Sequence, residues 1–100
     1  MVQARIDIPL EAIRVICRRY YVRELAVFGS VLRGDFRPDS DVDFLVEFDP
    51  EAPIGLIEFY RMQDELSDAV HRPVDLVPKD GLKRRIRDRV LSTAQVVYAA

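Results

Sequence analysis

The sequence has few of the features that place a small protein in a specialised class. It contains a single cysteine, Cys17, among its 100 residues, which excludes a framework of internal disulfide bonds. Cys17 lies among apolar residues at helical spacing, so we expect a buried thiol that packs as a small hydrophobic side chain. The chain has no repeats, low-complexity tracts or linkers. We therefore expect one domain that spans residues 1–100.

Long apolar runs and a large net charge are also missing. No run approaches membrane-spanning length, and residues 1–7 lack the basic start and apolar block of a signal peptide. We therefore expect a soluble, cytoplasmic protein without a membrane partner. The formal net charge of −2 provides no general attraction to nucleic acid or anionic membranes. Hydrophobic residues make up 49% of the chain, which is enough to build a core.

The sequence does contain an alternation of helical and strand patterns. Apolar residues at helical spacing predict a helix that begins near Pro9 and ends near Tyr20. Short apolar runs predict strands at residues 25–28, 41–48 and 74–77, and helical spacing predicts helices at 54–70 and 82–90. Residues 95–98 fit either a last strand or a helix tail. The expected inner stripe of the helix at 54–70 consists of Leu56, Phe59, Tyr60, Leu66 and Val70.

The order of these elements predicts the sheet. A whole helix links the second and third strands, and such a link normally makes a right-handed parallel crossover. Asp43 and Asp75 are then at equivalent positions on parallel neighbours. The turn at Gly29 and Ser30 reaches the same end only if the first strand is antiparallel to the second. We therefore expect an α/β fold with a small mixed sheet flanked by helices, in which the second strand is central.

Three carboxylates are expected to converge at this end of the sheet, from Asp41, Asp43 and Asp75. At an exposed site, each pair of like charges costs on the order of 1 to 4 kcal/mol at 4 Å. A fold that keeps such a cluster usually holds a cation there. Oxygen ligands favour Mg²⁺ or Mn²⁺ over zinc, and two such ions can clamp the attacking and leaving oxygens of a phosphoryl displacement.

The Gly29–Ser30 turn has the features of a phosphate site. Backbone N–H groups at a helix N-terminus bind phosphate oxygens, and the Ser30 hydroxyl can add a donor. Arg33, about one helical turn further on, could reach the same anion or pair with an acidic residue. Taken singly, each of these features is also explained by an ordinary turn, cap or ion pair. Their occurrence together in this order is a more specific indication of a metal and phosphate site than any one of them.

Two other groups of residues have ordinary explanations. We expect His71 to cap a helix C-terminus rather than to act as a base. The end of the chain is locally basic, and three interpretations remain open: a solvated helix face, a contact with a protein partner or a triphosphate, and a contact with an RNA backbone. The basic residues concerned are Lys79, Lys83, Arg84, Arg85, Arg87 and Arg89.

The pattern resembles the minimal nucleotidyltransferases of the DNA polymerase β-like superfamily. The matching residues are Gly29–Ser30, Arg33–Gly34, the Ser40–Asp41–x–Asp43 motif and Asp75. The resemblance implies that Asp41, Asp43 and Asp75 are catalytic and hold two Mg²⁺ ions, and that Gly29 and Ser30 bind the triphosphate of ATP. We expect Arg33 to be the third nucleotide-binding residue, because of its place just beyond this turn. One departure concerns Val31–Leu32, where many relatives carry Arg–Ala, so one phosphate contact is missing here.

The resemblance also implies a partner. Small members of this family are often antitoxins of HEPN-domain ribonuclease toxins, and some transfer AMP from ATP to a tyrosine of the toxin. One hundred residues leave little room for an acceptor-binding domain, which agrees with an acceptor supplied by a partner, in a homo- or hetero-oligomer. Two alternatives stay open: a non-catalytic antitoxin that masks its toxin, and a nucleotidyltransferase that acts on RNA, although direct nucleic-acid binding is not expected from the net charge.

Overall fold

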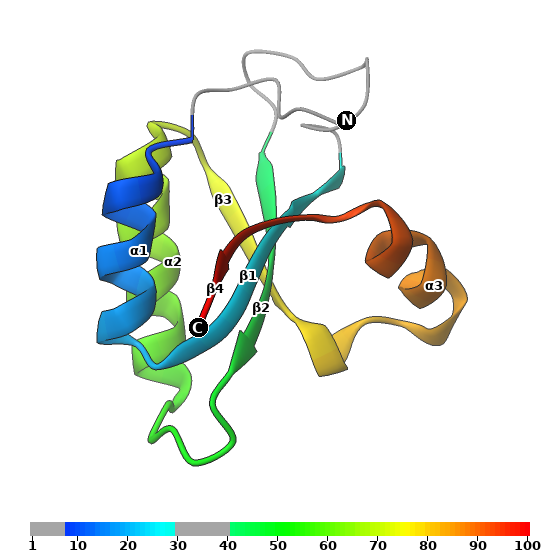
Figure 1. Ribbon diagram of the computed structural model, residues 1–100, viewed down its shortest axis with the longest axis horizontal. Coiled ribbons are helices and arrows are strands. Elements are labelled where there is room, and N and C mark those ends of the chain that lie inside the picture. The colour runs from blue at the N-terminus through cyan, green and yellow to red at the C-terminus, as the bar shows by residue number, and fades with distance from the viewer. Residues whose placement is uncertain (1–7, 30–40) are drawn as a thin grey trace.

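The computed structural model describes residues 8–29 and 41–100. Within these ranges the chain forms a helix, two strands, a second helix, a third strand, a short 3₁₀ turn, a third helix and a fourth strand (Figure 1). In chain order these are α1 (Leu10–Arg19), β1 (Val22–Phe28), β2 (Val42–Phe48), α2 (Leu56–Val70), β3 (Val74–Pro78), η2 (Lys79–Gly81), α3 (Arg84–Thr93) and β4 (Gln95–Ala99).

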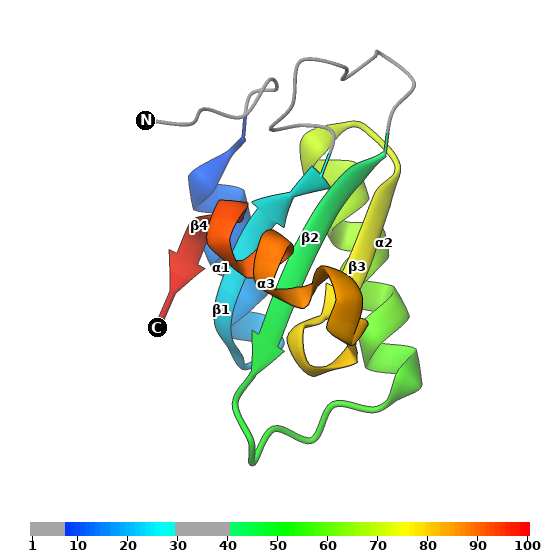
Figure 2. The ribbon, with the colours of Figure 1, turned by 90° about the vertical axis from the view of Figure 1, so that its right-hand side faces the viewer.

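The four strands form one mixed sheet in the order β3-β2-β1-β4. β1 is antiparallel to both β2 and β4, and β2 is parallel to β3. Helices α1 and α2 cover one face, and α3 crosses the other (Figures 1 and 2). The predicted α/β fold and the directions of the first three strands are confirmed. Residues 95–98, which the sequence left undecided, belong to an edge strand.

The core lies mainly between the sheet and the pair α1 and α2. Side chains alternate along β2, so Phe44 and its neighbours two residues away face the helices, while Leu45 faces α3. On the α3 side, a smaller cluster joins Leu45 to Ala26 and Val90. Val90 is the one buried residue of α3. The larger cluster includes the fully buried Ile13, Cys17, Leu25, Val42, Phe44, Met62 and Leu66.

The predicted inner stripe of α2 is partly wrong, and the apolar spacing of the last helix also does not correspond fully to burial. Leu56 and Tyr60 of α2 are 71% and 53% exposed, and burial in this helix falls on Met62, Leu66 and Val70. In the last helix, Ile86 is 45% exposed although it lies one turn from buried Val90. Periodicity shows which residues share a helix face, but it does not show how much of that face a neighbouring element covers.

The predicted cap of α2 is confirmed. His71 adopts a left-handed conformation with φ of 57°, and its N–H donates to the Ser67 carbonyl. The Ser67 hydroxyl donates to the carbonyl of Arg72 at 2.6 Å, which fixes the turn into β3. The expectation of a buried thiol is also confirmed, since Cys17 has no exposed surface. None of the helices in the described ranges is long and apolar enough to cross a membrane.

Candidate active site

The acidic residues predicted to act together lie on neighbouring strands at one end of the sheet. Asp43 pairs with Phe28 of antiparallel β1 and with Asp75 of parallel β3, as the crossover argument predicted. Asp41 lies one residue before β2. The next residue, Val42, donates its N–H to the Pro73 carbonyl at 2.9 Å, which joins the starts of β2 and β3. Adjacent strands lie about 4.8 Å apart, so Asp43 and Asp75 are side by side in the backbone.

All three carboxylates extend from the face of the sheet opposite α1 and α2. Asp41 and Asp43 alternate with Val42, which is in the main core, and Asp75 is next to Leu76, which is also in that core. Asp41 and Asp75 are exposed, and Asp43 is half-buried. A ligand can therefore reach the carboxylates from the side of the sheet that α3 covers only in part (Figure 2).

Gly29 lies directly against the carboxylate of Asp43. Its φ of +80° is in the left-handed region, and a Cβ added there would be 2.1 Å from Oδ2 of Asp43. Any side chain at position 29 would therefore displace the carboxylate. The sequence pointed to a turn whose backbone N–H groups bind phosphate, and the structure adds that a carboxylate of the same chain lies against this glycine. The need for glycine follows from both the backbone angle and the contact.

The structure does not place every predicted residue. Ser30 and Arg33, together with the expected helical turn and Val31, lie outside the described residues. Among the residues that are described, no three His, Cys, Asp or Glu side chains are already arranged to hold a metal ion. The backbone register thus brings Asp43 and Asp75 together, while a metal triad would require their side chains to converge. The donor chemistry, carboxylate oxygens without His or Cys, suits Mg²⁺ or Mn²⁺.

A second charged group lies on the same face, and no pattern in the sequence predicts it. Lys79 of η2 lies 3.3 Å from Glu24 of β1 and 3.8 Å from Glu47 of β2. Glu24 and Glu47 are cross-strand partners, so the lysine offsets the repulsion of two facing carboxylates. Lys79 is therefore not part of the basic helix with which the sequence grouped it. No local pattern signals this contact, because it joins three separate elements.

The remaining basic residues do belong to the last helix or its start. Residues 83–89 are exposed, and none of their cations forms an ion pair within the part of the chain that the structure describes. These cations are Lys83, Arg84, Arg85, Arg87 and Arg89. They give α3 a solvated, positively charged surface on the face that also carries the carboxylates.

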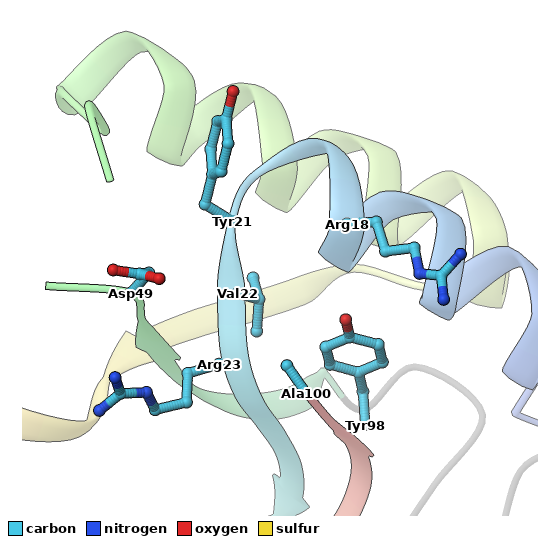
Figure 3. Close-up of a pocket in the computed structure, with 7 residues that line it drawn as sticks. All are labelled: Arg18, Tyr21, Val22, Arg23, Asp49, Tyr98 and Ala100. Atoms are coloured by element: carbon cyan, nitrogen blue, oxygen red, sulfur yellow. The ribbon is translucent and has the colours of Figure 1, made fainter. Parts of the chain in front are cut away.

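A shallow hollow of about 250 Å³ lies at the opposite end of β1 from the carboxylates (Figure 3). The side chains of Arg18 and Arg23 point away from one another, and Tyr21 projects outward. The two arginines therefore do not converge on a common ligand, and the hollow is separate from the candidate active site. Its lining is formed by Arg18, Tyr21, Val22, Arg23, Asp49, Tyr98 and Ala100.

Comparison with known proteins identifies the family. The model of the nucleotidyltransferase domain matches residues 10–97, which include every described element from α1 through most of β4. The chain belongs to the nucleotidyltransferase family. This nucleotidyltransferase is 45% identical over 80 residues to the protein adenylyltransferase MntA of Thermococcus cleftensis, a match that covers 80% of this chain and 77% of that protein.

Solved structures give the same result for the fold of this nucleotidyltransferase. A minimal nucleotidyltransferase of known structure is 38% identical, with a TM-score of 0.71, and the match covers 85% of each chain. The complex of the tri-AMPylated Shewanella oneidensis HEPN toxin with its MNT antitoxin contains a chain with a TM-score of 0.65. That match covers 91% of this chain and 70% of the other at 18% identity, so what it shows of this chain is the fold.

Proposed function

We propose that this nucleotidyltransferase transfers AMP from ATP to a hydroxyl group, a tyrosine hydroxyl in particular, of a HEPN-domain toxin, and so acts as its antitoxin. The observation that carries the proposal is the register that aligns Asp43 with Asp75 and sets Gly29 against Asp43. The relative named as a protein adenylyltransferase, at 45% identity, supports AMP as the transferred group and a protein as the acceptor. A chain of the same fold bound to an AMPylated HEPN toxin supports the choice of partner.

The proposed reaction exchanges a phosphoanhydride bond of ATP for a phosphodiester bond to the acceptor. The acceptor oxygen forms a bond to the α-phosphorus of ATP, the bond from that phosphorus to the bridging oxygen of the β-phosphate breaks, and pyrophosphate leaves. The acceptor hydroxyl must lose its proton as the new bond forms. Asp75 is exposed on an edge strand beside Asp43 and is the residue we assign to accept this proton, either directly or through water.

The chain's other residues position the nucleotide. Asp41, Asp43 and Asp75 would supply the oxygen ligands for Mg²⁺, with Mn²⁺ as an alternative. When bound, the two ions would neutralise negative charge on the triphosphate and on the oxygens at the reacting phosphorus. Gly29 and Ser30 bind phosphate oxygens through the turn, and Arg33 adds a positive charge. Gly29 has a second task in this arrangement, because its missing side chain leaves room for the Asp43 carboxylate.

The test is AMP transfer to the co-purified toxin with α-labelled ATP and Mg²⁺. We expect Asp41→Asn and Asp75→Asn each to lower the rate of labelling by about 100-fold or more, because each variant loses a charged ligand at the reacting phosphate. Asp68→Asn, an exposed aspartate on α2, is the matched control and should label at the normal rate. Intact mass of the toxin would confirm additions of AMP. Normal labelling by Asp41→Asn would refute the proposed reaction.

A second candidate function is an antitoxin that works by binding alone. It is favoured by one observation: the described acidic side chains are not arranged as a ready metal site. The triple variant Asp41→Asn, Asp43→Asn and Asp75→Asn separates the two functions. A catalytic antitoxin should lose protection of cells against the toxin, whereas an antitoxin that masks its target should still protect them. Co-purification of the variant with the toxin shows that binding itself has survived.

A further inference from the structure

The two edges of the sheet differ in how they are protected against pairing with another strand. At the β3 edge, Asp75 is an exposed charge and Pro78 lacks an N–H donor. Gln63 of α2 also reaches this edge, where its Oε1 accepts a hydrogen bond from the Leu76 N–H at 3.0 Å. Charges, prolines and covered backbone groups are the usual means by which proteins prevent edge-to-edge association.

Within residues 8–29 and 41–100, the β4 edge has none of these devices. Its five residues, QVVYA, include no charged residue and no proline, and Val96 is 50% exposed. In Figure 2, β4 is the outermost strand, and no described helix or strand lies beyond it. The Ala100 N–H donates inward to the Arg23 carbonyl at 2.9 Å. Because successive N–H groups of a strand alternate in direction, the Ala99 N–H points outward to this open edge.

We propose that β4 pairs antiparallel with β4 of a second copy of this chain, around a two-fold axis. The edge complements itself, because an uncharged strand meets an identical uncharged strand without repulsion. The β3 edge does not complement itself in this way, because pairing of two β3 strands would bring the charges of two Asp75 side chains together. A two-fold pairing also closes the assembly. The resulting eight-stranded sheet has β3 at both ends, and both of these edges are protected.

The surroundings of β4 can supply the area that a stable dimer needs. A specific interface buries about 800 Å² on each partner, more than two five-residue strands provide by themselves. Arg18 of α1 and Tyr98 of β4 both line the hollow of Figure 3, so this side of α1 flanks the edge. Leu10, at 58% exposure, and Arg14 are two turns and one turn from Arg18 on the same side of the helix.

Tyr21 lines the same hollow, with its ring pointing away from Tyr98 (Figure 3). It is 56% exposed and has a φ of 59°, which is uncommon for a bulky side chain. Its carbonyl accepts a hydrogen bond from the Asp49 N–H at 2.9 Å, which holds the turn in place. The tyrosine is thus presented to solvent from a restrained backbone. An aromatic side chain presented in this way is typical of interfaces.

The proposed dimer leaves the candidate active site accessible. Asp43 and Asp75 belong to β2 and β3, on the other half of the sheet, so β4 pairing does not cover them. Self-association can be measured without AMP transfer, because the mass of the chain in solution does not depend on its activity. A failure of the dimer and a failure of the proposed reaction would therefore be separate results.

The experiment is sedimentation equilibrium of the chain alone over about 1 to 100 µM. We expect the unaltered chain to approach the mass of two copies. Val96→Lys should weaken association by about tenfold or more, because it places charges from both copies at the interface. Val15→Lys is the matched control: Val15 is 53% exposed on α1 and points away from the sheet, so this variant should associate normally.

A second variant guards against an indirect effect of the lysine. Ala99→Pro removes the outward N–H without removing the bond from Ala100 to Arg23, so β4 should remain paired with β1 while the dimer dissociates. Circular dichroism checks that both variants are folded. A mass of one copy at the highest concentration would overturn the proposal. Slow hydrogen exchange at Ala99 in a monomer would also overturn it, since another segment of the same chain would then cover the edge.

Discussion

Asp43 contacts a different kind of neighbour on each side. Phe28 is its partner on β1 and Asp75 its partner on β3, while the backbone of Gly29 lies against its carboxylate. A half-buried carboxylate beside a second carboxylate is unfavourable unless other groups stabilise the charge. In the proposed site, Asp43 and Asp75 would share a bound cation. The surrounding residues are accordingly sensitive to small changes in volume.

Substitution of Gly29 by alanine should damage both stability and activity. The added Cβ would meet Oδ2 of Asp43 at 2.1 Å, and alanine also disfavours a φ of +80°. We expect the free energy of unfolding to fall by about 1 to 3 kcal/mol, measured by urea denaturation, with loss of AMP transfer. Gly81→Ala is the control, because its Cβ would meet only Pro78 at 3.7 Å. Equal stability of the two variants would contradict this account of Gly29.

The thiol of Cys17 should make stability depend on pH in the alkaline range. Burial raises the pKa of Cys17 from 9.0 to about 12. The unfolded chain therefore loses this proton near pH 9, while the folded chain keeps it until about pH 12. The associated stability is complete below the lower pKa and falls by about 1.4 kcal/mol per pH unit between the two values.

Replacement of the thiol by Cys17→Ala tests this dependence. At about pH 8, the variant should be less stable than the unaltered chain, because it leaves a small cavity. Above about pH 9, the difference in unfolding free energy should shrink and then reverse, since only the unaltered chain carries the thiol penalty. Burial also raises the pKa of Tyr20, with a further rise from its hydrogen bond to Glu65, but both proteins share this group. Parallel curves from urea denaturation across the alkaline range would show that the thiol does not contribute.

At the scale of elements, single side chains join helices to their neighbours. Glu65 of α2 accepts from both the Tyr20 hydroxyl and the Arg19 guanidinium, which links the end of α1 to the middle of α2. Gln63 of the same helix accepts from the Leu76 N–H on the outer side of β3. α2 therefore fixes both its partner helix and the strand that carries Asp75. By contrast, α3 contributes one buried side chain and is the least anchored of the three helices.

Removal of the amide by Gln63→Leu should destabilise the β3 edge. The Leu76 N–H would lose its acceptor, and a donor left unsatisfied in a partly buried place costs about 1 to 3 kcal/mol. We expect a loss of this size in urea denaturation, together with faster hydrogen exchange at the Leu76 amide. Asp64→Asn, on the exposed side of α2, should change stability by less than about 0.5 kcal/mol. Unchanged exchange at Leu76 would show that this hydrogen bond contributes little.

At the scale of the whole molecule, one sheet separates two tasks. The face covered by α1 and α2 holds most of the core, and the opposite face carries the carboxylates and the cations of α3. The sheet order also places Asp75 near one edge and the uncharged strand β4 at the other. The proposed catalytic site and the proposed dimer edge thus lie in different halves of the sheet.

Ligand binding should raise the stability of the whole chain. A ligand present at 100 times its dissociation constant adds about 2.7 kcal/mol, which corresponds to a rise in Tm of roughly 10 °C or more for a domain of this size. We expect such a rise with Mg²⁺ and a non-hydrolysable ATP analogue, measured by differential scanning calorimetry. Chelation of Mg²⁺ should remove most of it.

Two variants separate specific from general binding. Asp41→Asn should abolish most of the rise in Tm, because it removes a proposed ligand from an exposed position without changing the core. Asp68→Asn should retain the full rise. An equal rise in both variants would place the nucleotide elsewhere on the chain.

Most of the predicted sheet is confirmed because the patterns behind the prediction were local or followed from general rules of chain connection. The crossover helix predicted parallel β2 and β3, and equal distances from the strand starts predicted the pairing of Asp43 with Asp75. The metal ligands and the roles of Ser30 and Arg33 stay predictions. Lys79 was wrongly grouped with the last helix, because its partners Glu24 and Glu47 are far away in the sequence.

The sequence alone thus determined which residues alternate along β2, where the second and third strands begin to within one residue, and which two aspartates become neighbours. The first strand is longer than predicted, because β1 begins at Val22 rather than at residue 25. Only the tertiary structure decided how far each face is covered. Leu56 and Ile86 are exposed, Gly29 meets Asp43, and β4 is an edge strand with no further described strand beside it. Each of these results depends on where an element from another part of the chain ends. Periodicity is a property of one segment, whereas burial is a property of the packing between segments.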